Sequence, residues 1–268
     1  MSVSTDKVTA LLQATAAQEI MPRFQSLAED EVRHKADGEP VTVADEAAEA
    51  RLTEGLLDLL PGSIVIGEEA IAKNPEGLAA VDTDSPYWLI DPIDGTANFA
   101  AGRPTFVVMV ALVIGGRISI SWIHDPIAGS TAIAEAGAGA WLGPTRLTAR
   151  SPDSMEGLRG TLHTGRYGGP ELDRRAQALR PRLGAIPTLR CAGQEYIRLA
   201  AGEIHYCLFT KLMPWDHAPG VLLYREAGGL ARLFDGREYQ SSIVKGPPLL
   251  MAGDGALWDH LRGLLWPD

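Results

Sequence analysis

The sequence has few cysteines, and their spacing argues against two common ways of stabilising a small protein. Cys191 and Cys207 are the only two in 268 residues. No Cys-x-x-Cys or Cys/His spacing accompanies them, so the pattern favours neither a disulfide framework nor a zinc site. Long hydrophobic runs are also lacking. None approaches the ~18 residues that cross a bilayer, and the N-terminus has no basic segment followed by an apolar one. We therefore expect a reduced, cytoplasmic protein with no membrane partner.

An excess of positive charge is lacking as well. The chain has 24 basic and 34 acidic residues, which gives a formal net charge of −10 at pH 7. Because a phosphate backbone repels a chain of this sign, we expect no nucleic-acid polymer as a partner. With 46% hydrophobic residues, the composition is that of a globular protein that can bury a large core.

In the first half of the chain, hydrophobic spacing predicts two helices followed by a hairpin-rich sheet. We expect a helix from about Asp6 to Arg33, then a polar turn at Lys35–Pro40. The pattern Thr42-x-x-Asp45 is typical of a helix start, and this second helix should continue to Leu60. Strands are expected at 106–114, 118–123 and 130–135, with Gly115-Gly116 joining the first two.

In the second half, helices and strands alternate. We expect helices near 171–180, 194–201, 215–227 and 256–265, and strands near 187–191, 204–209, 230–234 and 249–252. The chain contains no repeat and no linker. These features predict one unit over 1–268, with an N-terminal α+β half of about 1–150 and a C-terminal α/β half of about 151–268, built as stacked α and β layers.

The most informative segment is Asp91-Pro92-Ile93-Asp94-Gly95-Thr96, which follows the apolar run 87–90. An Asp at the end of a strand can face the crevice beyond the sheet, and Pro92 biases the turn so that the two carboxylates can converge. Gly95 allows a close backbone approach, and the N–H groups after it are free to bind an anion. A metal site beside an anion site indicates phosphate chemistry.

Three further acids have the same potential, although each alone has an ordinary structural explanation. Glu68 follows the apolar run 63–67, Asp216 opens a helix, and Asp45 lies at a helix start where it can act as a cap. Together with Asp91 and Asp94 they supply five negative charges. Roughly two or three Mg²⁺ ions would neutralise that charge, and Mg²⁺ prefers oxygen ligands of this kind.

These segments together resemble the inositol monophosphatase family, which belongs to a larger group of metal-dependent, lithium-sensitive phosphatases that includes fructose-1,6-bisphosphatases. The resemblance extends from about Lys35 to Gly229. It departs from the usual pattern at Pro219, where an Ala is typical. The segments that carry it are Gly67-Glu68-Glu69, Asp91–Phe99 and Trp215–Gly220, supported by Val41–Asp45 and Gly137–Ala140.

The resemblance implies a layered αβαβα sandwich, a homodimer and a site for two or three Mg²⁺ ions. Glu68, Asp91 and the carbonyl of Ile93 would hold the first ion. Asp91, Asp94 and Asp216 would hold the second.

The resemblance also implies roles in catalysis. Asp45 and Glu68, through waters, would assist a third ion. Glu68 and Thr96 would position and deprotonate the attacking water, and the backbone of Gly95 and Thr96 would hold the phosphate. The expected activity is therefore a Mg²⁺-dependent phosphomonoesterase that hydrolyses a small polyol or sugar-type phosphate by direct attack of a metal-activated water.

Substrate identity stays open at this point. The family often has an acid on the strand before the Trp-Asp motif, and the corresponding segment 207–214 contains none. Histidinol phosphate, fructose 1,6-bisphosphate and 3′-phosphoadenosine 5′-phosphate are alternatives to an inositol phosphate. The candidate substrate contacts are Asp94, Arg190, Gly193, Glu195, Lys211 and His217.

Two other readings of the acidic motif are possible. Haloacid-dehalogenase-type phosphatases use Asp-x-Asp-x-Thr to form an aspartyl phosphate, but here the two Asp residues are one position further apart. A regulatory protein that binds metal and phosphate without catalysis is the alternative outside the enzymes.

Overall fold

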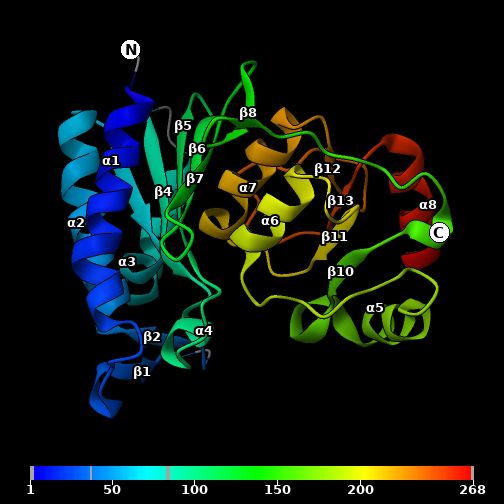
Figure 1. Cartoon of the computed structure of the whole chain (residues 1–268), viewed down its shortest axis with the longest axis horizontal. Coiled ribbons are helices and arrows are strands. Elements are labelled where there is room, and N and C mark those ends of the chain that lie inside the picture. The colour runs from blue at the N-terminus through cyan, green and yellow to red at the C-terminus, as the bar shows by residue number, and fades with distance from the viewer. Residues whose placement is uncertain (1–2, 37, 83–84, 267–268) are drawn as a thin grey trace.

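The computed structural model describes residues 3–36, 38–82 and 85–266, and in them helices and sheets alternate in layers (Figure 1). A helical layer lies against a seven-stranded sheet, a second helical layer separates that sheet from a four-stranded one, and a third covers the far side. The predicted sandwich is confirmed. In order, the helical layers are α1 (Thr5–Thr15) with α2 (Val43–Leu59), α6 (Ala192–Ala200) with α7 (Pro214–Glu226), and α5 (Gly165–Leu179) with α8 (Gly255–Leu265).

The larger sheet follows the chain in order, and its first two strands are parallel while the others are antiparallel. The predicted hairpin is confirmed, since Gly115 and Gly116 turn between β5 and β6 with φ of 57° and 72°. Its strands are β3 (Ile64–Gly67), β4 (Tyr87–Asp94), β5 (Val107–Ile114), β6 (Arg117–Asp125), β7 (Ser130–Glu135), β8 (Gly139–Leu142) and β9 (Thr145–Arg146).

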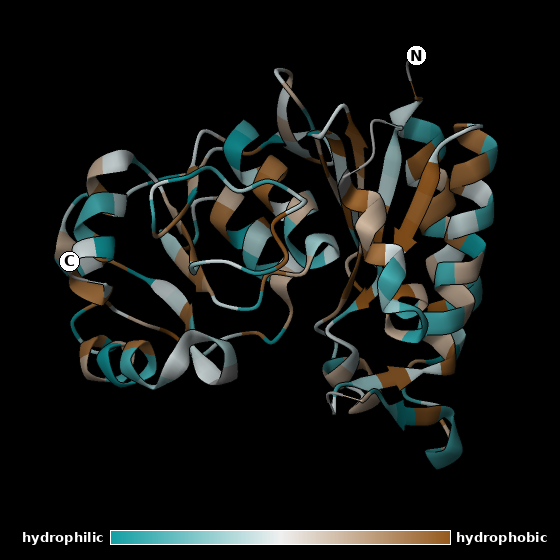
Figure 2. Cartoon of the chain, turned by 180° about the vertical axis from the view of Figure 1, so that it is seen from behind, coloured by the Kyte–Doolittle hydropathy of each residue, from teal (hydrophilic) through white to brown (hydrophobic). Residues whose placement is uncertain are grey.

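Strand β5 is buried on both faces, which explains its unbroken apolar sequence. Val107 and Met109 pack into the core around α6 and α7, whereas Val108 and Val110 pack into the core under α1 and α2. Figure 2 shows hydrophobic residues concentrated on the strands of this sheet, between its two covering layers. The adjacent strand β4 is thereby held rigidly from both sides.

The smaller sheet has the order β10-β11-β13-β12, in which only β10 and β11 are parallel. A two-stranded hairpin, β1 and β2, lies apart from both sheets. The strands are β10 (Gly160–His163), β11 (Tyr206–Phe209), β12 (Leu230–Leu233), β13 (Leu249–Ala252), β1 (Val32–His34) and β2 (Pro40–Thr42). The short helical segments are α3 (Glu68–Lys73), α4 (Thr96–Ala100), the π-helical turn Ala16–Ile20 and the 3₁₀ turns Met21–Arg23, Glu29–Glu31, Pro75–Asp82 and Met155–Gly157.

Two predicted elements differ from the structure. The first helix ends far before Arg33: α1 stops at Thr15, a π turn and a 3₁₀ turn containing Pro22 follow, and β1 begins at Val32. Pro22 has no N–H to continue a helix. The strand expected at 187–191 is wrong, because Arg190 has a φ of 55°, which no strand allows. Asp37 of the expected polar turn lies outside the described residues.

None of the helices in the described part of the chain combines the length and apolar composition that a membrane span requires.

The two central helices pack closely because a glycine faces an aromatic ring. A Cβ built on Gly220 of α7 would lie 2.0 Å from Cδ2 of Tyr196 in α6. Tyr196 is fully buried, so its ring cannot move aside into solvent. The glycine that ends the Trp-Asp segment is therefore required by packing.

We expect Gly220→Ala to lower the free energy of unfolding by about 1–3 kcal/mol, because the methyl group overpacks the contact with Tyr196. Gly263 in α8 is a matched control, since a Cβ there meets nothing within 4 Å. Gly263→Ala should leave stability unchanged or raise it by up to about 1 kcal/mol, since Ala is the better helix former. Denaturant unfolding of both variants tests this. Equal effects of the two substitutions would contradict the packing argument.

Candidate active site

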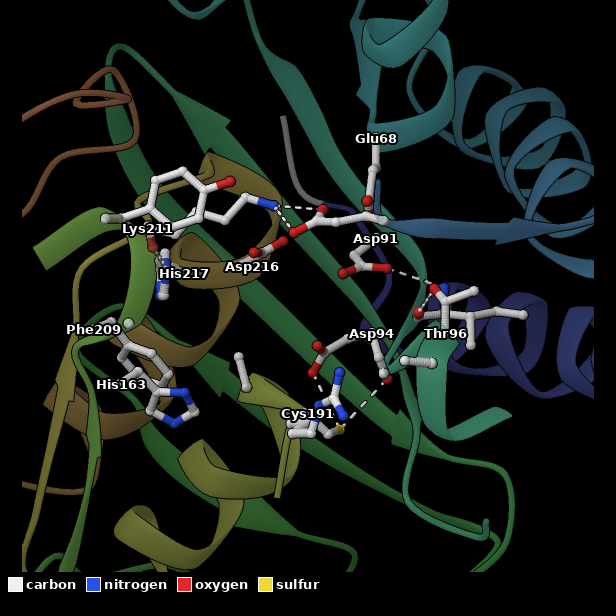
Figure 3. A pocket seen from close by; sticks show the side chains of 18 of the residues that line it. Glu68, Asp91, Asp94, Thr96, His163, Cys191, Phe209, Lys211, Asp216 and His217 are labelled. Carbon is white, nitrogen blue, oxygen red and sulfur yellow. Dashed lines mark hydrogen bonds and ion pairs between the residues drawn. The ribbon is translucent and has the colours of Figure 1, made fainter. Parts of the chain in front are cut away.

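Asp91 and Asp94, at the end of β4, line one opening (Figure 3). The register between β4 and β5 is interrupted between Asp91 and Asp94. In this irregular turn the N–H of Ile93 donates to Oδ1 of Asp91 at 3.0 Å. Gly95 follows with a φ of 96°, and a Cβ at this position would lie 2.8 Å from the carbonyl oxygen of Thr105. Only glycine fits this turn, from which α4 begins.

Acids from two other elements reach the same space. Glu68 begins α3 directly after β3, the parallel neighbour of β4, so both strands deliver their last residues to one edge of the sheet. Asp216 lies in the first turn of α7. Oxygen atoms of Glu68, Asp91 and Asp216 all lie within 4.8 Å of one another. Figure 3 shows these side chains, with Asp94, around one opening.

Electrostatics make this arrangement costly without a cation. Burial, followed by the charge of Glu68, raises the pKa of Asp91 and that of Asp216 well above their usual range. Burial also raises the pKa of Asp94. Among the described residues no Lys, Arg or His forms an ion pair with Asp91 or Asp216. A set of carboxylate oxygens without a cationic partner suits a hard divalent cation.

Glu68 does have a cationic partner, which comes from the loop between β1 and β2. Nζ of Lys35 lies 2.6 Å from Oε1 of Glu68 and 2.8 Å from Oε1 of Glu69. Burial alone would lower the pKa of Lys35, but the two carboxylates raise it above its usual range. The same loop carries Glu39, which pairs with Lys211 at 2.5 Å. One loop thus contacts both the Glu68 side and the segment before α7.

Asp94 is held by the opposite wall of the site. Its Oδ2 accepts a hydrogen bond from the N–H of Gly193 at 2.6 Å and one from Sγ of Cys191 at 3.2 Å. The candidate substrate contact Gly193 therefore has its N–H directed to Asp94. Through these bonds the start of α6 is attached to the end of β4.

Asp45 lies behind the site and contacts Thr96. Thr42 and Asp45 form the expected capping box at the start of α2. Oδ1 of Asp45 lies 3.0 Å from the hydroxyl of Thr96, which is also 2.9 Å from the carbonyl of Ile93. Burial raises the pKa of Asp45 to about 6. The cap and the site are thus joined through one hydroxyl group.

A residue that the sequence analysis did not single out, Glu49, positions the Glu68 turn. Its carboxylate accepts hydrogen bonds from the N–H groups of Glu69 at 2.8 Å and Ala70 at 2.7 Å. Its Cδ lies 2.3 Å from where a Cβ of Gly67 would be, so a side chain at residue 67 would displace this carboxylate. Glu49 follows Asp45 by one helical turn on the buried face of α2. An acid in that position was the available signal.

The acids line one side of a cavity of about 400 Å³, and the other side is largely aromatic. The ring of His163 stacks on that of Phe209, with centroids 4.6 Å apart and an interplanar angle of 28°. Phe209 in β11 also stacks on Tyr196 at 5.5 Å. Arg190 and Tyr167 also line the cavity.

Two other candidate contacts are buried side chains, Glu195 behind His163 and His217 in the cavity wall. Glu195 is fully buried, and its carboxylate pairs with Nε2 of His163 at 2.6 Å while it accepts the hydroxyl of Thr161 at 2.5 Å. Burial would raise the pKa of Glu195, but His163 and Thr161 lower it. Both ring nitrogens of His217 are occupied, by Tyr196 at 3.0 Å and the carbonyl of Lys211 at 2.6 Å. Burial lowers the pKa of His217 to about 4.

Comparison with known proteins gives relatives along nearly the whole chain. The model of the inositol monophosphatase family matches residues 3–261. A Thermotoga maritima protein named fructose-1,6-bisphosphatase/inositol-1-monophosphatase is 30% identical over 201 residues, which cover 74% of this chain and 73% of that protein. A Pseudomonas aeruginosa protein named Nus factor SuhB is 34% identical over 233 residues, which cover 85% and 84%.

Solved structures agree on the fold. A Thermotoga maritima IMPase superposes with a TM-score of 0.81 at 24% identity, over 97% of this chain and 95% of the other. The suhB extragenic suppressor protein from Bartonella henselae gives 0.82 at 23% identity, over 97% of each chain. The family match includes all the elements that deliver the clustered acids, so this chain belongs to the inositol monophosphatase family.

Proposed function

We propose that this protein is a Mg²⁺-dependent phosphomonoesterase that hydrolyses a small polyol or sugar-type phosphate by direct attack of water. The observation that carries the proposal is the convergence of Glu68, Asp91 and Asp216 within 4.8 Å, beside the turn at Gly95. The family membership and the name of the Thermotoga relative support a phosphatase. A cytoplasmic location, a homodimer and inhibition by lithium are further parts of the proposal, and they rest on the family resemblance and composition.

The donor set fits two Mg²⁺ ions, because it consists of oxygen ligands with excess negative charge. Glu68, Asp91 and the carbonyl of Ile93 would hold one ion. Asp91, Asp94 and Asp216 would hold the other. When bound, these ions lower the pKa of a water molecule and neutralise charge on the phosphate group.

Thr96 and Asp45 are suited to move the proton of the attacking water. The hydroxyl of Thr96 can accept that proton while it donates its own to Oδ1 of Asp45, 3.0 Å away. A pKa of about 6 makes Asp45 a usable base near neutral pH. The N–H groups of Gly95 and Thr96, at the start of α4, have no acceptor within that helix and would hold the phosphate oxygens. No protein nucleophile is required for this reaction.

We expect purified protein to release phosphate from a monoester only when Mg²⁺ is present, and Asp91→Asn to reduce the rate on the order of 10³-fold, because Asp91 would be shared by both ions. Phosphate release with and without excess chelator measures both effects. Asp259→Asn, an exposed position in α8, is the matched control and should keep full activity. Full activity of the wild type in chelator would disprove the metal assignment.

The same substitution should have an opposite effect on stability. In chelator we expect Asp91→Asn to melt a few degrees above the wild type, because the amide removes a buried negative charge and can still accept the N–H of Ile93. Mg²⁺ should raise the melting temperature of the wild type and have little effect on the variant. Thermal unfolding of both proteins tests this independently of turnover. Equal stabilisation of both by Mg²⁺ would contradict a role for Asp91 as a ligand.

Thr96→Ala should lower kcat by roughly 10²–10⁴-fold with little change in KM, since it removes the hydroxyl between water and Asp45. Thr96→Ser keeps that hydroxyl and should retain most of the activity. Steady-state kinetics of the two variants are the measurement. If the Ser variant is as inactive as the Ala variant, the proton path through residue 96 is wrong.

A further inference from the structure

Among the described residues, the side of the cavity away from the clustered acids presents no acidic side chain that is available to a substrate. Glu195 is buried behind His163, and Glu39 is paired with Lys211. The ring of Phe209 is almost fully buried, because the rings of His163 and Tyr196 stack on it, so His163 forms much of the surface here. A leaving group here would contact flat rings along its carbon skeleton, and its polar groups would have to find partners at the rim.

Arg190 also lines the cavity, and its backbone has a conformation that an L-residue avoids. Its φ is 55°, and in the described part of the chain only Gln25 shares a positive φ among residues other than glycine. Glycine would adopt this conformation without the steric conflict at Cβ. Strained residues of this kind persist only where their surroundings impose the conformation, and they cluster at functional sites.

Hydrogen bonds on both sides of Arg190 hold its backbone in this conformation. On one side, the N–H of Leu189 donates to Oε1 of Glu195 at 2.7 Å, and the carbonyl of Leu189 accepts from Nδ2 of Asn98 at 3.0 Å. On the other side, Sγ of Cys191 bonds to Asp94 at 3.2 Å. Asn98 and Glu195 are buried, so the turn is fixed from inside the protein.

The side chain that this turn presents is a cation without a partner. Arg190 lines the cavity, and within the described residues its guanidinium makes no hydrogen bond or ion pair. By contrast, Arg33 pairs with Glu46 and Arg174 pairs with Glu171. A guanidinium fork matches the two oxygens of a carboxylate or phosphate.

We propose that Arg190 selects substrates whose leaving group carries a second anionic group, a phosphate or a carboxylate, besides the phosphate that is removed. This inference rests on the proposed phosphatase function. The scissile phosphate binds at the Gly95 turn, the carbon skeleton lies along the His163–Phe209 wall, and the second anion reaches the guanidinium. Arg190 is thus a specificity residue of the leaving-group side of the cavity.

The test compares substrates that differ in the charge of the leaving group, all with Mg²⁺. Fructose 1,6-bisphosphate carries a second phosphate, 3-phosphoglycerate carries a carboxylate, and inositol 1-phosphate carries neither. We expect Arg190→Gln to lower kcat/KM at least 10-fold for whichever charged substrate the wild type prefers, and to change it less than twofold for inositol 1-phosphate. Arg182→Gln, an exposed position outside the cavity wall, is the matched control and should change none of them.

A second variant separates specificity from structure. Arg190→Gly should lose the same preference while its melting temperature stays equal to that of the wild type or rises, because glycine relieves the strained φ. If Arg190 were purely structural, Arg190→Gly would instead lower the melting temperature and reduce kcat/KM equally for all substrates.

Three results would overturn the inference. If Arg190→Gln lowered kcat/KM equally for charged and uncharged leaving groups, Arg190 would bind the scissile phosphate. If the variant left kcat/KM unchanged for every substrate, Arg190 would contact only solvent. A wild type that hydrolyses inositol 1-phosphate but neither charged substrate would refute the role of Arg190 and leave the phosphatase proposal intact. Hydrolysis of none of the three substrates by the wild type would instead refute the phosphatase proposal itself, and the substrate class with it.

Discussion

Three buried carboxylates lie together at one edge of the larger sheet, where water screens their negative charges poorly. They belong to Asp91, Asp94 and Asp216, and the surrounding structure holds them in place. Strand β4 cannot retreat, because both of its faces are packed. Helix α7 is fixed against α6 by the contact of Gly220 with Tyr196. The free energy that packing contributes opposes the repulsion between the acids, so the site is preorganised for a cation before one binds.

Much of the fold was predictable, because the signals were local. The hairpin at Gly115-Gly116 and the capping box at Thr42 depend on a few neighbouring residues, and both are confirmed. The failed strand at 187–191 shows the limit of such reasoning. Its apolar residues suit a strand. The backbone of Leu189, however, forms its hydrogen bonds with the side chains of Asn98 and Glu195, so these groups are not available to a neighbouring strand.

In the candidate site, too, some features follow from local sequence and others depend on residues that are remote in the chain. Glu68 and Asp91 each follow an apolar run that can be read along the chain, and the family resemblance grouped them, as they are in the structure. The environments of Glu195 and Lys211 could not be read in this way, because their partners His163 and Glu39 lie 32 and 172 residues away. Sequence reasoning therefore finds the clustered acids more readily than the groups on the other side of the cavity.

The contact between Glu49 and Gly67 has a consequence for how the family can diverge. The carboxylate of Glu49 fills the space beside residue 67 and binds the two N–H groups that follow Glu68. A larger residue at 67 would expel the carboxylate, and a shorter acid at 49 would abandon those N–H groups. The two positions, 18 residues apart in the sequence, can therefore be replaced only together. In an alignment of relatives they should covary as one inherited unit, separate from the positions that determine the substrate.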